Sequence, residues 1–182
     1  MDKYRDQVLV ERCRKGDHAA FTELIIRYQR PIYNAAYRVL GNTEDASDIA
    51  QVVFLKVIER LDDYDPQYRF FSWIYRIALN ESLNLLRHNG REEPLDEVPE
   101  IPDADSAGPE SRAYAAELSR RVQRALMSMK ADDRAVLTLR HFSECSYEEM
   151  GEILDLEEKK VKSRLFEARQ RLRVLLKDLT HA

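Results

Sequence analysis

A capped helix followed by a short turn and a basic second helix constrains the fold of this chain most strongly. It lies in SYEEMGEILDLEEKKVKSRLFEARQRLRVLL, residues 146–176. Ser146 and Glu149 have the spacing of a capping box, in which each side chain satisfies a backbone amide of the first turn. In the second helix a narrow apolar stripe recurs every three or four residues, at Val161, Leu165, Ala168, Leu172, Leu175 and Leu179. This pattern predicts a helix-turn-helix, whose second helix offers its N-terminal end to the major groove of DNA.

Length and composition limit the number of domains in the chain and its place in the cell. With 182 residues, 44% of them hydrophobic, the chain can form one medium domain or two small ones with real cores. The sequence has no apolar run that could cross a bilayer and no apolar block typical of a secretion signal, so we expect a cytoplasmic protein without membrane insertion. Cys13 and Cys145 lack metal-ligand spacing, which favours buried or idle thiols over a metal site or a disulfide. No metal or cofactor is expected.

Charge is distributed unevenly, although the net formal charge is only -4. Residues 1–89 carry thirteen basic and thirteen acidic side chains, residues 90–111 carry one and eight, and residues 112–182 carry fifteen and twelve. Because neutralisation of phosphates supplies most sequence-independent DNA affinity, a chain with this balance should bind naked DNA poorly by itself. The charge pattern therefore indicates that a larger partner assists DNA binding.

Helical periodicity without any alternating strand pattern predicts an all-α protein of two small helical domains joined by an acidic flexible linker. Gly41 should end a long helix, and Thr43 should cap the next one. Four of the six prolines fall in the acidic segment, which cannot hold a regular helix. We therefore expect domains at 1–89 and 112–182, with a linker at 90–111. Helices are expected at 6–15, 18–40, 44–61, 69–88, 113–129 and 132–142, before the helix-turn-helix.

Aromatic residues cluster in the last third of the expected first domain. Six of the sixteen aromatic residues lie between positions 64 and 75: Tyr64, Tyr68, Phe70, Phe71, Trp73 and Tyr75. On the helix at 69–88, one face carries Phe71, Ile74, Ala78, Leu85 and Leu86, and the opposite face carries Trp73, Arg76, Asn80, Asn84 and Arg87. Aromatic rings stack on unpaired bases, amides hydrogen-bond to base edges and guanidinium groups bind phosphates. This face is therefore typical of a surface that binds single-stranded or melted DNA. The alternative is a surface helix with one exposed tryptophan.

The helix at 44–61 has apolar residues on two sides. Its core stripe is Ala46, Ile49, Ala50, Val53 and Val57. Val52, Leu55 and Ile58 lie across from that stripe, beside Asp48 and Gln51. Either another part of the chain covers this second face, or a partner helix binds there.

Four segments in this order resemble the extracytoplasmic-function (group 4) sigma factors of bacterial RNA polymerase. The segments are LVERCRKGDHAAFTELIIRYQ, EDASDIAQVVFLKVI, FFSWIYRIALN and LRHFSECSYEEMGEILDL followed by VKSRLFEAR. The resemblance implies a non-enzymatic initiation factor that binds core RNA polymerase, through the largest-subunit clamp helices and the flap, and promoter DNA. It also implies control by an anti-sigma factor, often membrane-anchored.

The resemblance assigns three sets of residues. The polymerase-binding set is Glu44, Asp48, Gln51, Val52 and Leu55. The minus-10 DNA-binding set is Asp63, Tyr64, Tyr68, Arg69, Trp73, Arg76, Asn80 and Asn84. The minus-35 DNA-binding set is Arg140, Tyr147, Lys159, Lys160, Lys162, Ser163, Phe166 and Glu167.

Two departures from the family pattern bear on promoter choice. The chain has Glu157, Glu158, Lys159 and Lys160 where members commonly have Pro-x-Gly-Thr, and it has Glu167 where many have a basic residue. An acidic side chain can accept a hydrogen bond from cytosine N4, so Glu167 is a candidate determinant of base preference in the minus-35 element. The alternative is that Glu167 simply pairs with Arg164 or Arg171 on the helix surface.

The acidic linker has two interpretations. Its eight carboxylates could occupy a basic channel built for RNA, or it could be a solvated tether. The two interpretations can be distinguished by neutralising Glu92, Glu93, Asp96 and Glu97. Only the channel interpretation predicts that abortive synthesis and promoter escape would change.

Two other function classes fit the sequence less well. A free-standing helix-turn-helix regulator leaves the aromatic stripe unexplained. An α-helical enzyme finds little support, because the four histidines are scattered and no nucleophile, phosphate loop or HExxH pair is present.

Overall fold

The computed structural model describes residues 3–89 and 109–178, and in these ranges all regular structure is helical. The expected all-α class is therefore confirmed. The α-helices are α1 (Lys3–Arg14), α2 (His18–Leu40), α3 (Thr43–Glu59), α4 (Phe70–Asn89), α5 (Pro109–Met127), α6 (Ala131–His141), α7 (Tyr147–Leu154) and α8 (Glu158–Asp178), with a short 3₁₀ helix η1 (Leu61–Asp63). Most of the segment expected to be the linker, residues 90–108, lies outside the described residues.

Caps define both ends of the long helix α2. The Asp17 carboxylate accepts hydrogen bonds from the backbone amides of Ala19 and Ala20, and these bonds together with Arg12 lower the pKa of Asp17. At the other end Gly41 has a φ of 75°, in the left-handed region that glycine adopts without strain, and its amide donates to the carbonyl of Tyr37. The glycine stop is confirmed.

The start of α3 differs from the sequence expectation. Asn42 is the N-cap, and its side-chain oxygen accepts from the amide of Asp45 at 2.9 Å, whereas Thr43 is already the first helical residue. Asparagine caps helices at least as well as threonine, so either residue fits the sequence. The prediction that Thr43 caps this helix was wrong by one position.

Helices α1 to α4 form a bundle in which α2 contacts α1, α3 and α4. Its centre holds a buried polar site: Asp6 accepts from the guanidinium of Arg27 and, at 2.6 Å, from the hydroxyl of Tyr28. A buried carboxylate needs such partners, because an unpaired one would be strongly destabilising. The pairing therefore ties α1 to the middle of α2.

The helix-turn-helix is formed by α7 and α8 and begins at the expected residue. The hydroxyl of Ser146 accepts from the amide of Glu149, and the carboxylate of Glu149 accepts from the amide of Ser146, which confirms the capping box. Of the expected apolar stripe on α8, Val161, Leu165 and Ala168 are buried, Leu172 and Leu175 are half-buried, and Leu179 lies outside the described residues.

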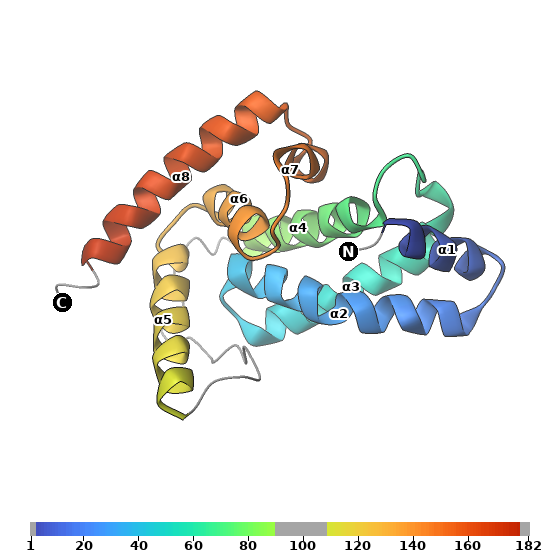
Figure 1. Cartoon of the computed structure of the whole chain (residues 1–182), viewed down its shortest axis with the longest axis horizontal. Helices are drawn as coiled ribbons and strands as arrows, with labels where there is room; N and C mark the ends of the chain where they lie inside the picture. Colours follow the sequence, from blue (N-terminus) through green and yellow to red (C-terminus); the bar gives the residue numbers. More distant parts are fainter. Residues whose placement is uncertain (1–2, 90–108, 179–182) are drawn as a thin grey trace.

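The helix-turn-helix half packs directly against the first bundle. Helix α2 contacts α5 and α6, and α4 contacts α6 and α7, which lies across one side of α4 (Figure 1). A single continuous cluster of buried apolar residues runs from Leu9 to Ala168 through both halves. Two predicted domains thus share one core in this arrangement.

The turn between α7 and α8 depends on a glycine. A Cβ atom built on Gly151 would lie 2.8 Å from the backbone oxygen of Leu156, although an alanine inside a helix normally stabilises by about 1 kcal/mol over glycine. We therefore expect Gly151→Ala to destabilise the protein, by about 1–3 kcal/mol, because the turn must shift to relieve the clash. Urea unfolding measures this change, with Glu148→Ala on the exposed side of α7 as control; a stabilised Gly151→Ala variant would contradict the geometry.

Candidate functional site

The N-terminal part of α8 presents an exposed polar face. Lys159, Lys160, Lys162, Ser163 and Glu167 are all exposed, and the side chain of Phe166 is 63% exposed. Their opposite face is held by the buried stripe of the same helix. The fold therefore positions an outward surface of cations, one aromatic ring and one carboxylate on a rigid helix, as the sequence predicted.

A pair of cations flanks the ring of Tyr147 beside this face. The guanidinium of Arg140 lies 5.0 Å from the ring centroid, and the ammonium of Lys162 lies 5.1 Å from it. Arg140 also donates to the carbonyl of Cys145 at 2.7 Å, and Lys162 pairs with Glu158. These contacts join α6, α7 and α8 into one positively charged corner.

Glu167 has a partner on its own helix. Its carboxylate lies 3.3 Å from the guanidinium of Arg171, four residues along, and Arg171 also pairs with the buried carboxylate of Asp133 on α6. Of the two partners expected from the sequence, Arg171 is the one that pairs with Glu167, while Arg164 lies 3.8 Å from Asp132.

The aromatic cluster is more deeply buried than the sequence suggested. Tyr64 is only 3% exposed, its hydroxyl donates to the carbonyl of Tyr68, and burial raises its pKa to about 12. Trp73 is half-buried, with its ring centroid 5.5 Å from that of Tyr64 and 5.6 Å from that of Phe70. Tyr64 is therefore a core residue in this structure, with its ring packed against the rings of Phe70 and Trp73.

The outer part of the same region remains open to solvent. Asp63, Tyr68, Asn80 and Asn84 are exposed, and the amide oxygen of Asn84 accepts from Arg87. Tyr68 is 53% exposed in the loop that precedes α4. This surface keeps an aromatic ring and two amide side chains for contact with a ligand.

The two arginines predicted for the same surface instead reach across to α7. The guanidinium of Arg69 pairs with the carboxylate of Glu149, and the Nε of Arg76 donates to the carbonyl of Glu152 at 2.8 Å. Sequence patterns could not reveal these contacts, because they join positions about eighty residues apart.

Arg38 is a buried residue of the interface between the halves that the sequence did not single out. It is 5% exposed, donates to the side chains of Gln123 and Ser119 at 3.2 Å, and lies 4.2 Å from the ring centroid of Phe142. The side chain of Gln123 in turn donates to the carbonyl of Tyr37. The only sequence signal was an arginine in an otherwise apolar end of α2, in the run YRVL.

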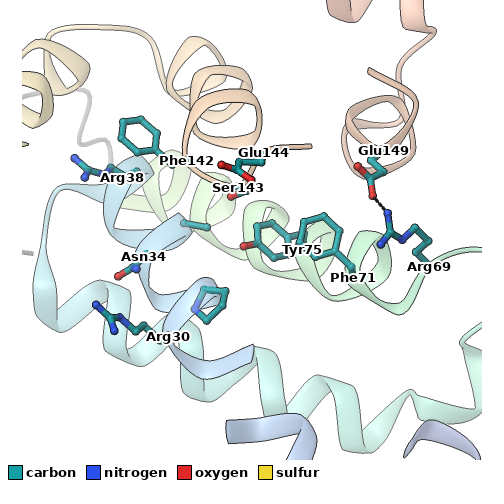
Figure 2. A pocket seen from close by; sticks show the side chains of 12 residues that line it. Arg30, Asn34, Arg38, Arg69, Phe71, Tyr75, Phe142, Ser143, Glu144 and Glu149 are labelled. Carbon is teal, nitrogen blue, oxygen red and sulfur yellow. Dashed lines mark hydrogen bonds and ion pairs between the residues drawn. The ribbon is translucent and has the colours of Figure 1, made fainter. Parts of the chain in front are cut away.

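A cavity of about 490 Å³ lies between the halves. Figure 2 shows Arg69 and Glu149 on one side of it, Arg38 and Phe142 on the other, and Tyr75 with Ser143 between them. Burial raises the pKa of Tyr75 to about 12, and its hydrogen bond with Ser143 opposes that shift. The interface is thus lined by polar groups and is not closely packed throughout.

The second face of α3 is not covered by any described part of the chain. Leu55 and Ile58 are 59% and 56% exposed, Glu44, Asp48 and Gln51 are exposed, and Val52 is half-buried. A groove of about 710 Å³ runs along this face, lined on the α2 side by Phe21, Ile25, Gln29, Arg30 and Tyr33. Of the two expected explanations, cover by a neighbour within the described chain is ruled out for Leu55 and Ile58.

Within residues 3–89 and 109–178, no cluster of histidine, cysteine, aspartate or glutamate could hold a metal ion. In the same part of the chain, no helix has the length and apolarity needed to span a membrane.

Comparison with known proteins identifies the family. Residues 24–92 match the model of Sigma-70 region 2, and residues 119–172 match that of Sigma-70, region 4. The ECF RNA polymerase sigma-E factor of Escherichia coli strain K12 is 36% identical over 178 residues, which cover 93% of each protein. The ECF RNA polymerase sigma factor SigW of Bacillus subtilis strain 168 is 34% identical over 179 residues, which cover 93% of this chain and 96% of SigW. The chain belongs to the ECF family of RNA polymerase sigma factors.

The fold agrees with that membership. The solved structure of CnrH in complex with the cytosolic domain of CnrY aligns with a TM-score of 0.71 at 26% identity, and covers 96% of this chain and 98% of CnrH. As an ECF sigma factor the chain is a transcription initiation factor and not an enzyme. The exposed face of α8 belongs to the segment that matches region 4, and the faces of α3 and α4 belong to the segment that matches region 2.

Because Glu167 pairs with Arg171, the question is whether its carboxylate also determines base preference in this sigma factor. If the carboxylate contacts DNA, Glu167→Arg should change the preferred base at one position of the minus-35 element, by about 1–3 kcal/mol of discrimination. Binding-site selection with polymerase holoenzyme measures the preference. Glu167→Gln is a matched control that keeps the side-chain shape. If wild type and Glu167→Arg prefer identical elements, Glu167 has no role in base preference and only pairs with Arg171 on the helix surface.

Proposed function

We propose that this sigma factor recruits core RNA polymerase and directs it to promoters by reading two elements, one with each half of the chain. The halves correspond to residues 1–89 and 112–182. Each half makes a weak, salt-sensitive contact with DNA, and polymerase holds the two at a fixed spacing. The second contact then becomes effectively intramolecular, so that modest affinities multiply. The chain performs no bond chemistry; polymerase carries out nucleotidyl transfer.

The polymerase-binding surface in this proposal is the second face of α3. The exposed Glu44, Asp48 and Gln51 share this face with Val52 and Leu55, and a groove of about 710 Å³ lies beside them. Apolar anchors inside a polar rim are typical of helix-in-groove binding. We assign this surface to the clamp helices of the largest polymerase subunit, and the flap to the second half.

The exposed face of α8 is the observation that carries the promoter-reading part of the proposal. Lys159, Lys160 and Lys162 supply charge for phosphates, while Ser163, Phe166 and Glu167 can reach base edges. Arg140 and Tyr147 extend the same surface. We assign these eight residues to the minus-35 element, read as duplex.

Capture of the opened minus-10 element is assigned to the loop after η1 and to α4. Tyr68 and Trp73 offer rings for stacking, Asn80 and Asn84 offer amides, and Asp63 lies at the loop entrance. Unstacking a base costs a few kcal/mol, which contacts of this kind can offset. Tyr64 is left out of the assignment, because its side chain is buried.

Control by an anti-sigma factor is the remaining part of the proposal. In its solved structure CnrH is bound to the cytosolic domain of CnrY. The uncovered groove beside α3 could accept a helix from such an inhibitor as well as from polymerase, so the two would compete. We place this competition in the cytoplasm, where polymerase works.

Run-off transcription with core enzyme on a library of genomic fragments tests the proposed function. The sigma factor should produce discrete transcripts from a small set of fragments, and core enzyme alone should not. The selected fragments should share two elements at one spacing. The proposal fails if the purified chain, free of any inhibitor, gives no specific transcript.

Leu55→Asp should weaken binding to core polymerase by about thirtyfold or more, because a charge would replace an apolar anchor at the centre of the proposed contact. Val8→Asp is the matched control: Val8 is 41% exposed on α1, which packs against α2, α4 and η1. Competition against a labelled sigma factor for limiting core enzyme measures both. Equal loss in the two variants would argue against the α3 surface.

A further inference from the structure

The loop proposed to capture the opened minus-10 element is held through its backbone by α1. We call residues 61–68 the capture loop; they comprise η1 and the irregular segment that leads to α4. Within this loop Leu61 and Tyr64 are buried, and the other six residues are exposed. A loop with so few buried side chains has little local stability of its own. Its conformation therefore depends on the groups that bind its backbone.

Arg14, the last residue of α1, donates hydrogen bonds to three carbonyl groups of the capture loop. Its Nη2 lies 3.0 Å from the carbonyl oxygen of Leu61, 3.4 Å from that of Asp62 and 2.6 Å from that of Tyr64. Its Nε also donates to Leu61, at 3.3 Å. The Arg14 side chain is 24% exposed, so these bonds are partly shielded from water. Three carbonyls of one short loop thus converge on a single guanidinium.

Two further contacts restrain the rest of the capture loop. The side-chain amide of Gln7 donates to the carbonyl of Pro66 at 2.7 Å, and Gln7 lies about two turns before Arg14 on the same face of α1. On the other side, the buried ring of Tyr64 packs against α4, and its hydroxyl donates to the carbonyl of Tyr68. Helix α1 itself packs against η1 and α4 (Figure 1). The loop is therefore bound both by α1 and by α4.

The guanidinium of Arg14 faces oxygens of its own chain with every nitrogen. Its Nη1 lies 3.7 Å from the carboxylate of Glu11, and its Nε lies 3.8 Å from the carboxylate of Asp62. Its Nη2 is the donor to the three carbonyls. A DNA phosphate would have to displace these oxygens to bind Arg14. The contacts therefore favour a role in holding the loop over direct contact with the DNA backbone.

We propose that Arg14 is a positioning residue that fixes the capture loop in the conformation that reads the minus-10 element, so that α1 contributes to promoter selectivity. This inference rests on the proposed function of the loop. A guanidinium can serve several carbonyls because it carries five N–H groups in a rigid plane, whereas a lysine ammonium is a point charge on a flexible stem. A backbone that is restrained before binding loses less conformational entropy on binding, so positioning raises affinity without a contact to DNA.

Positioning affects only the DNA binding that uses the loop. The apparent affinity for a strand that the loop reads falls with the fraction of molecules in which the loop has the binding conformation. A single strand of scrambled sequence is bound mainly through its phosphates, which does not require that conformation. Loss of Arg14 should therefore lower the ratio of the two affinities, whereas partial unfolding would lower both affinities.

Two substitutions of Arg14 separate positioning from charge. Arg14→Lys keeps the charge but cannot hold three carbonyls at once, and Arg14→Gln removes the charge as well. The matched control is Arg5→Lys, the same substitution on the same helix, at a side chain that is 64% exposed and pairs with Glu23. Trp73 is the one tryptophan of the chain and lies against Tyr64, so quenching of its fluorescence by acrylamide reports on the order of the loop.

Quenching is measured on the full chain, and DNA binding on holoenzyme reconstituted with core polymerase. The probes are a single strand about ten nucleotides long, which wild-type holoenzyme but not core enzyme enriches from a random pool, and a scrambled version of it. Both Arg14 variants should show stronger quenching of Trp73 and bind the enriched strand about tenfold more weakly, with unchanged affinity for the scrambled strand. The dependence of affinity on salt should stay as in wild type, because no phosphate contact is lost. Arg5→Lys should match wild type in every measurement.

Three results would overturn the inference. The first is unchanged quenching of Trp73 in both Arg14 variants, because the loop would then be ordered without Arg14. The second is wild-type affinity in Arg14→Lys combined with a loss and a weaker salt dependence in Arg14→Gln, which would indicate a direct phosphate contact. The third is an equal loss for the scrambled strand or in Arg5→Lys. A wild-type holoenzyme that enriches no strand would instead contradict the proposed function, and quenching would still decide whether Arg14 orders the loop.

Discussion

Packing of the helix-turn-helix half against α2 and α4 is the contact on which the rest of this structure depends. Because α2 contacts α5 and α6 while α4 contacts α6 and α7, both helices serve two halves at once. Arg38, Arg69 and Arg76 supply the polar part of that contact. Helix α4 also carries residues of the surface proposed to capture opened DNA, among them Trp73, Arg76 and Asn80. Their exposure is therefore set by the arrangement of the halves as well as by local structure.

The charge of the chain is consistent with a DNA-binding surface whose exposure depends on how the two halves are arranged. A net charge of -4 gives little general attraction to phosphate, and the basic excess is confined to the second half. Of the cations near α4, Arg69 and Arg76 have acceptors within the chain, and in the second half Lys162 and Arg171 are paired as well. Under the proposed function, a sigma factor with this charge would gain DNA affinity by binding polymerase, which lets its two weak DNA contacts act together.

Local features of the fold were predictable, and long-range ones were not. The capping box at Ser146, the helix stop at Gly41 and the buried stripe of α8 depend on residues within one or two turns, so their spacing appears in the sequence. Periodicity also indicated the second apolar face of α3, but it left open whether another part of the chain covers that face. It could not tell which helix covers a given face, so the contact of α4 with α7 was missed.

The burial of individual aromatic residues also could not be predicted from the sequence. Tyr64 and Tyr68 lie in the same loop region and are equally plausible ligands for a base, yet one ring is buried beneath Trp73 and the other is exposed. Arg38 shows the converse case, since a charged residue in an apolar run is buried because Gln123, Ser119 and Phe142 meet it from a distant helix and loop. Only tertiary structure supplies such partners.

The distance between the halves, measured in the free chain and on core polymerase, tests the account most directly. Spin labels at Val8→Cys and Val174→Cys, in a chain with Cys13 and Cys145 replaced by serine and alanine, report this distance by pulsed electron resonance. The account predicts one short distance in the free chain and a longer one after core enzyme is added. An unchanged distance in the fully bound complex would contradict it, because Arg69 and Arg76 would then remain held by α7 during initiation.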